Sequence, residues 1–413
     1  MSSTVVISPI RRWMRASTTA DAKERWIARR LTLTWALLIV NVLTFYKQTW
    51  SGLPLAFPIP SILGKVITQG ALPAALLLAL TVNRRLLVRP NAFLCIVSLL
   101  GVVALMVALE PGHLSTLYRT FRLIGFIATL WLLTPWWGRR DLLLVRCHLV
   151  VVGVILGIVL IGIPLAPHTA YSQHRLEGAL WPFPPTQVAH FAAVMTGLVV
   201  LLWLCGRLSG RLTLLVAVVA GGILLATHTR TALIAMLAGI FVGGLSLFAG
   251  NAKVRKVFAA AGLIVSVGAI TLSGLVTTWL ARGQSTNQLT GLTGRTSVWS
   301  ALVSTPRNLF EVFFGFGMSN LSFNGLSIDS NWLGAYLDLG LVGAAIGAAM
   351  LVFLLATAYF QPRGAQRALA LFLITYCTIS SFTETGLSDP SFYLLELALA
   401  ASLLVQPTGR RWV

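Results

Sequence analysis

Five arginines stand where their side chains could form a binding site for an anion. Arg119 and Arg122 are three residues apart in an apolar run, so a helix would place them on one face. Arg175 and Arg230 stand in loops between apolar runs, and Arg295 stands in the long segment 276–331. A guanidinium group matches phosphate oxygens in a bidentate way, better than an ammonium group does. The arginines favour one shared site for a phosphate or diphosphate; the alternative is that each pairs with a structural carboxylate.

The pair Arg119 and Arg122 poses an energetic question. An arginine at membrane depth costs about 2.5–3.5 kcal/mol on insertion scales. Two on one helix face therefore imply a polar cavity or a bound anion. The alternative is snorkelling to the surface from the first turns of the helix.

Asp329 is the candidate general base. A carboxylate in a loop could remove the proton from an acceptor hydroxyl, or it could be the N-cap of the helix that follows. Asp338 lies inside that helix, and we favour a structural role for it: pairing with an arginine or capping an internal helix end. The histidines show no metal-ligand spacing such as HExxH, so we expect neither a metal nor another cofactor.

These residues must be positioned by membrane helices. Of 413 residues, 57% are hydrophobic and 10% are charged, which is the composition of an integral membrane protein. A bilayer core of about 30 Å needs roughly 20 apolar residues per helix. The sequence predicts an all-α polytopic membrane protein with about twelve transmembrane helices, over residues 31–47, 63–82, 91–109, 114–134, 142–163, 186–205, 211–227, 231–249, 257–275, 332–359, 365–382 and 388–405.

The basic residues predict the orientation. Most of the 31 Lys and Arg residues fall before the first helix or in alternate short loops, a pattern that marks the cytoplasmic side. Both termini are then cytoplasmic, and this clustering argues against nucleic acid as a partner. The basic segment 1–30 could form a short interfacial helix over residues 19–30, with Trp26 at the headgroup level.

The chain divides into five parts on this basis. They are the basic segment 1–30, helices one to nine in 31–275, an extracytoplasmic loop over 276–331, helices ten to twelve in 332–405, and a cytoplasmic tail over 406–413. The loop contains Trp299 and paired glycines. Long loops between helices are uncommon unless they are functional or disordered, and its composition is not that of disorder. We expect it to hold the chemistry.

The sequence resembles the O-antigen ligase and O-antigen polymerase superfamily of bacterial membrane glycosyltransferases. That family carries a His-Asn or Asp-Asn pair, an aromatic-Leu step, an acidic residue and Gly-x-x-Gly. The similar residues here are Asp329-Ser330-Asn331-Trp332-Leu333 and Asp338-Leu339-Gly340-Leu341-Val342-Gly343. Supporting motifs are Arg175 with Gly178, the turn that ends at Arg230, and Gly294-Arg295 with Trp299.

The resemblance implies a membrane glycosyltransferase fold of the C type and metal-independent, inverting transfer. The donor would be a glycan on a polyprenyl diphosphate, and the acceptor a glycan or glycolipid hydroxyl, at the outer face of the bacterial cytoplasmic membrane. Arg230 and Arg295 would hold the donor diphosphate and Asp329 would activate the acceptor. Substrate contacts are expected from Arg175, Arg122, Arg119, Trp299 and Asn331. A flippase or a chain-length protein is a possible partner.

Two departures from the family pattern limit the assignment. The ligases usually have His at position 329 and Asn at position 330, and the segment Pro182-Phe183-Pro184-Pro185 replaces an Asn-Pro-Asn step. A polymerase or a glycan-attaching relative is therefore favoured over a lipopolysaccharide ligase. The competing class is a twelve-helix transporter or lipid-linked-oligosaccharide flippase, which should line its cavity with charges along the whole membrane depth. A purely structural membrane protein would not explain why these arginines lie outside the segments predicted to be cytoplasmic.

Overall fold

A computed structural model shows an all-α chain in which the only strands among the described residues form two short hairpins, β1–β2 (Tyr171–Ser172 and Arg175–Leu176) and β3–β4 (Ser322–Phe323 and Leu326–Ser327). The structure describes residues 19–44, 59–110, 114–139, 141–172, 174–271, 274, 279, 295–318, 322–323 and 326–406. The predicted segment 1–30 and tail 406–413 lie mostly outside this range, as does much of the loop 276–331.

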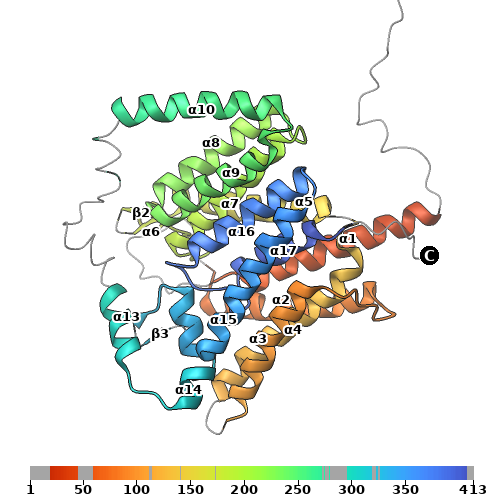
Figure 1. Ribbon diagram of the computed structural model, residues 1–413, viewed down its shortest axis with the longest axis vertical. Coiled ribbons are helices and arrows are strands. Elements are labelled where there is room, and N and C mark those ends of the chain that lie inside the picture. Colours follow the sequence, from red (N-terminus) through yellow and green to blue (C-terminus); the bar gives the residue numbers. More distant parts are fainter. Residues whose placement is uncertain are drawn as a thin grey trace, which may run out of the picture.

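Each of the twelve predicted apolar helices has a counterpart in the fold (Figure 1). They are α1 (Thr19–Asn41), α2 (Ser61–Val82), α3 (Ala92–Ala108), α4 (Leu114–Leu133), α5 (Asp141–Leu165), α7 (Pro185–Leu204), α8 (Gly210–Ala226), α9 (Arg230–Phe248), α10 (Ala252–Thr271), α15 (Asn331–Phe360), α16 (Ala365–Ser380) and α17 (Phe392–Leu404). Among the described residues, three short α-helices lie between them: α6 (Pro167–Ala170), α13 (Arg295–Ser304) and α14 (Leu309–Phe314).

Six helical segments of the described chain are long and apolar enough to cross a membrane. They are Ser61–Val82, Thr116–Trp136, Leu142–Leu165, Pro185–Leu204, Arg230–Phe248 and Asn331–Phe360. Four further apolar helices, α3, α8, α16 and α17, have 10–17 residues. The protein is thus an all-α protein with several candidate membrane spans.

The first helix corrects one prediction. The sequence suggested an interfacial helix over 19–30 followed by a separate span over 31–47, but α1 is continuous from Thr19 to Asn41. Neither Gly nor Pro interrupts that stretch, so nothing breaks its backbone hydrogen bonds. Arg30 lies over the Trp26 ring at 3.9 Å and thereby covers part of that side chain.

The tenth predicted helix is also corrected, because α15 is broken at Gly340. This residue has φ 65° and ψ −163°, a conformation that is essentially restricted to glycine. The break frees two carbonyl groups, and the amides of Phe316 and Gly317 donate to those of Leu337 and Asp338, both at 2.9 Å. The internal helix end that the sequence allowed near Asp338 therefore exists.

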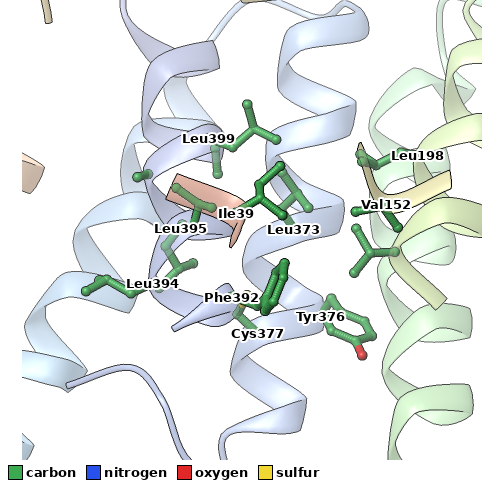
Figure 2. Packing of buried hydrophobic residues seen from close by; sticks show 14 of the residues in the cluster. Ile39, Val152, Leu198, Leu373, Tyr376, Cys377, Phe392, Leu394, Leu395 and Leu399 are labelled. Atoms are coloured by element: carbon green, nitrogen blue, oxygen red, sulfur yellow. The ribbon is translucent and has the colours of Figure 1, made fainter. Parts of the chain in front are cut away.

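Helices α7, α16 and α17 form the buried centre of the bundle. Most of their side chains are inaccessible, including Phe191 on α7, Phe372 on α16 and Leu397 on α17. Figure 2 shows Tyr376 and Phe392 in this centre, with Val152 of α5 and Leu198 of α7 beside them. Gly197 permits the close approach of α7 to α16, since a Cβ there would lie 2.0 Å from the Phe372 ring.

The two ends of the bundle differ in charge. At one end, which we call the basic end, Arg89 donates to the carbonyls of Trp137 and Gln406, and Lys253 donates to that of Trp203. These contacts join the loops that the sequence predicts to be cytoplasmic. The start of α1 lies on this side, at the right of Figure 1, and β2, α6 and α13 lie on the left. The opposite end, which we call the site end, carries the predicted functional residues.

Candidate functional site

The turn between α8 and α9 brings together two of the predicted arginines. Arg175, in the hairpin β1–β2, donates from Nε to the carbonyl of Thr227 at 2.9 Å and from Nη2 to Thr229 Oγ1 at 3.1 Å. Arg230 follows directly as the first residue of α9. His228, which lies between Thr227 and Thr229, has φ 51°, and this backbone conformation allows the turn to be this tight. Arg175 thus anchors the turn that presents Arg230.

The beginning of the long segment 276–331 reaches the same turn. The Trp279 ring stacks on His228 with centroids 5.5 Å apart and planes 23° from parallel. Its Nε1 donates to the carbonyl of Leu225 at 3.3 Å. One end of the predicted catalytic loop therefore lies beside Arg230.

The polar segment 381–391, between α16 and α17, connects α9 with α15. Thr383 Oγ1 donates to Thr231 Oγ1 at 2.9 Å, in the first turn of α9. Asn331, the first residue of α15, donates from its amide to the carbonyl of Ser381 at 2.9 Å. Its Oδ1 accepts from the amides of Gly386 at 3.3 Å and Leu387 at 2.7 Å. Asn331 is buried, so the observed function of its side chain is to hold this segment.

The same segment carries the carboxylate that faces the two arginines of α4. Arg122 Nη2 donates to the carbonyl of Asn41 at 2.7 Å, and Arg122 and Arg119 interact electrostatically with Asp389. Burial raises the pKa of the Asp389 carboxyl, and the two arginines oppose that rise. Among the described residues, Arg122 Nε and Asp389 Oδ1 are buried without a hydrogen-bond partner. Arg122 thus lies beside a carboxylate of the protein, which is the alternative that the sequence left open to a shared anion site.

Asp329 lies immediately before the N-cap of α15, so the prediction that it is the N-cap residue is wrong. The N-cap is Ser330, whose side chain makes no capping hydrogen bond. Asp329 is partly exposed and accepts from the Ser327 hydroxyl at 2.5 Å. Its assignment as the general base stays a prediction.

Two helix N-termini point toward this end without a side-chain cap. The N-cap residues Thr229 of α9 and Ser330 of α15 make no capping hydrogen bond through their side chains. The first backbone N–H groups of a helix have no partner inside the helix and carry a partial positive charge. Together with Arg230, they give the site end the electrostatic character of an anion site.

The helix α13 begins at Arg295, contains Trp299 and packs against the first part of α15. Its Val298 and Leu302 form a small apolar cluster with Ile328 and Leu337. Arg295 begins the helix, but its side chain lies outside the described residues, so its separation from Arg230 is not defined. Trp299 is partly exposed, and its buried Nε1 has no hydrogen-bond partner within the described part of the chain.

Sequence reasoning gave no role to Arg307, which the structure places in the same region. Its guanidinium carbon lies 4.3 Å from the Tyr336 ring centroid and 4.9 Å from that of Phe316. Its Nη1 donates to the carbonyl of Tyr336 at 3.3 Å. Aromatic residues in the glycine-broken run 314–317 were the only available signal for this stacked arginine.

A second ionisable cluster lies inside the bundle, and the sequence did not predict it. The Nε2 of His190 lies 2.8 Å from Glu396 Oε1 in the core. His148 Nε2 lies 3.8 Å from the same oxygen, and Cys377 Sγ lies 3.6 Å from Oε2. All four side chains are buried. Among the described residues, no group of three or more His, Cys, Asp or Glu is arranged to hold a metal ion.

Comparison of the chain with protein-family models and with curated proteins found no match. The functional argument therefore depends on the geometry of the site end. Arg175 and Arg230 come together there, and Arg119 and Arg122 reach the same polar segment through Asp389. Glu384 and Asp389 are among the carboxylates that the sequence left open as partners of the arginines, and the structure brings Asp389 to Arg119 and Arg122.

Proposed function

We propose that the protein is a twelve-helix membrane glycosyltransferase with a C-type fold. It moves or polymerises glycan from a polyprenyl-diphosphate donor to a hydroxyl of a glycan or glycolipid acceptor. The observation that carries the proposal is the convergence on segment 381–391. That segment contacts the start of α9 beside Arg230, the start of α15 beside Asp329, and the arginines of α4 through Asp389.

The donor diphosphate fits the α9 side of this end. Arg230 and the N–H groups at the start of α9 supply positive charge at fixed positions. As the glycosidic bond breaks, negative charge grows on the leaving diphosphate, and preorganised cations stabilise that charge. Arg175 holds the turn in place, and Arg295 would add a second guanidinium group from the long segment. Trp279 on His228 keeps that segment close to the donor.

The acceptor side is assigned to the start of α15. Asp329 is partly exposed and receives a hydrogen bond from Ser327, which orients the carboxylate. It would take the proton of the attacking hydroxyl as the bond to the sugar forms. The segments that carry Asp329 and Arg230 are joined through residues 381–391, so that base and leaving group are held on one framework.

The orientation of the proposal follows the positive charges. The basic end would face the cytoplasm and the site end the outside of a bacterial cytoplasmic membrane. The transporter alternative requires charges that line a cavity through the membrane. The ionisable groups His148, His190 and Glu396 inside the bundle have exposed fractions of 0%, 2% and 1% and are packed in the core without lining a cavity, which favours the enzyme.

The test is glycan analysis of a deletion strain complemented with variants. We expect Arg230→Ala and Asp329→Ala to lower transfer at least about a hundredfold at wild-type protein levels. Arg295→Ala should behave in the same way. Arg255→Ala, an exposed arginine of α10 at the basic end, is the matched control and should transfer normally.

The deletion phenotype identifies the reaction. Lipid-linked single repeats that accumulate outside without polymer indicate a polymerase. Polymer that persists on its lipid carrier without reaching an acceptor indicates a ligase. Repeats that accumulate on the cytoplasmic side would contradict the enzyme proposal and favour a flippase.

A further inference from the structure

An apolar groove with a volume of about 680 Å³ lies between α5, α7 and α8, away from the proposed active site. Its floor is formed by Met195, Val199 and Leu202 of α7, which are buried. Exposed side chains such as Val150 of α5 and Leu215 of α8 form its walls. The groove is thus open on its lateral side, where a membrane helix meets lipid.

Two glycines create the space within this groove. Gly153 and Gly157 line it from α5 and lie four residues apart, so they share a helix face. A Cβ added at Gly157 would have no atom within 4 Å, whereas at Gly153 it would touch only the Met195 methyl group at 3.3 Å. The space is therefore not filled by the described protein.

The groove ends in two arginines at the basic end. Arg146 of α5 and Arg207 of the α7–α8 turn line it, and both are exposed. Among the described residues, neither guanidinium group has a hydrogen-bond or ion-pair partner. Nearby, Lys253 is already bound to the Trp203 carbonyl and lies over its ring at 3.9 Å. An elongated apolar space with two available guanidinium groups at one end matches an amphiphile with an anionic head.

We infer that this groove binds an anionic glycerophospholipid of the membrane leaflet at the basic end. Its phosphate would lie on Arg146 and Arg207, which can bind phosphate oxygens in a bidentate way. One acyl chain would lie along Gly153 and Gly157. On α8 the groove runs from Leu212 to Ala220, about 12 Å at 1.5 Å per residue, close to the depth of one leaflet in a core of about 30 Å.

The groove is distinct from the donor site. Arg207 precedes α8 and Arg230 follows it, so the length of that helix, about 25 Å at 1.5 Å per residue, separates the two charged regions. A diphosphate bound at Arg230 therefore cannot contact Arg207. A bound lipid would instead fill the space between α5 and α8 and fix the position of both helices.

The test compares lipids on the purified full-length protein in a neutral detergent. Dioleoyl phosphatidylglycerol and dioleoyl phosphatidylcholine are titrated, and the midpoint of thermal unfolding is followed. We expect the anionic lipid to stabilise the wild type at a concentration about tenfold lower than the zwitterionic lipid. Arg146→Gln with Arg207→Gln should remove this preference. Arg255→Gln with Lys256→Gln removes the same charge outside the groove and should retain it.

A second pair of variants tests the acyl-chain position. Gly157→Phe fills the groove and should abolish stabilisation by the anionic lipid, whereas Gly222→Phe on the exposed face of α8 should not. Equal responses of the wild type to the two lipids would overturn the proposal, as would a preference that survives the double arginine substitution. A wild-type dimer that Gly157→Phe converts to a monomer would also overturn it, because a second copy of the chain would then be the occupant.

Discussion

The buried ionisable cluster around Glu396, which we call the central cluster, and the site end both contain ionisable groups removed from bulk water. They differ in how accessible those groups are to solvent. Glu396 and its two histidines come from the interiors of α17, α7 and α5 and are sealed by aromatic rings, with the Tyr393 ring centroid 4.5 Å from that of His190. At the site end, Asp329 and Arg122 are partly exposed and lie beside turns and helix ends. Residue type alone does not distinguish a structural charge from a functional one; access and the neighbouring backbone do.

Removing Glu396 gives the largest expected effect on stability. Glu396→Ala removes the hydrogen-bond partner of His190 Nε2, which costs about 1–3 kcal/mol for a buried polar group, and the cavity that it leaves in the core adds to this cost. We expect a strongly lowered unfolding temperature in detergent and normal transfer per folded molecule. Glu24→Ala, on the exposed side of α1, should change the stability by no more than about 0.5 kcal/mol. Full stability with lost transfer would place the central cluster in the mechanism and remove the contrast.

Gly340→Ala tests whether the site end depends on backbone geometry. Holding any other residue in the backbone conformation of Gly340 costs about 1–3 kcal/mol. A Cβ at this position would also lie 2.3 Å from the backbone of Phe313. We expect α14 to shift, the bonds to Leu337 and Asp338 to break, and transfer to be lost. Proteolysis within residues 295–330 should become faster while the centre of the bundle stays folded.

The control for this variant is Gly347→Ala in the same helix. A Cβ there meets no atom within 4 Å, so the variant should be as stable as the wild type or up to about 1 kcal/mol more stable. If Gly340→Ala behaved like Gly347→Ala, the break in α15 would have no part in shaping the site.

A double-mutant cycle on Arg122 and Asp389 should give the smallest effect. The single changes Arg122→Ala and Asp389→Ala each leave one charge without its partner, so we expect a coupling free energy of about 0.5–3 kcal/mol. Additive effects would mean that the two groups do not interact. The cycle is measured by thermal unfolding of the four proteins.

The pH dependence sharpens the same comparison. Because burial raises the pKa of Asp389 in the folded protein, the folded state binds that proton more tightly than the unfolded state. Stability from this group is therefore full below its ordinary pKa and decreases as the pH rises through the raised value. Asp389→Asn should remove this decrease, and an unchanged pH profile would contradict the assignment.

The apolar helices were predictable because hydrophobic length is a local property of the sequence. The apolar composition of α7 and α9 predicted both ends of each helix to within one or two residues. The break at Gly340 was not, since glycine is common in membrane helices and only its contact with Phe313 shows why it is needed here. The positive-inside pattern likewise predicted which loops share an end, because it depends on charge and not on packing.

The site was predictable in part. The arginine types and their segments pointed to one end, and the structure joins Arg175 to the turn before Arg230. The burial of His190 and the choice of Asp389 as the carboxylate beside Arg122 could not be predicted, because both depend on contacts between helices far apart in the sequence. Asn331 shows the opposite error: its position in a motif suggested substrate contact, but its side chain binds backbone amides.

The break in α15 also bears on how the chain enters the membrane during synthesis. Residues 341–360 alone are long enough to cross a bilayer core of about 30 Å, and they contain no charged residue. Asp338 belongs to the short helical part before the break, so the insertion machinery need not carry this carboxylate into the hydrocarbon. The part over residues 331–339 can then fold onto segment 381–391 only after α16 and that segment have been made, so the site cannot be completed while residues 341–360 are entering the membrane.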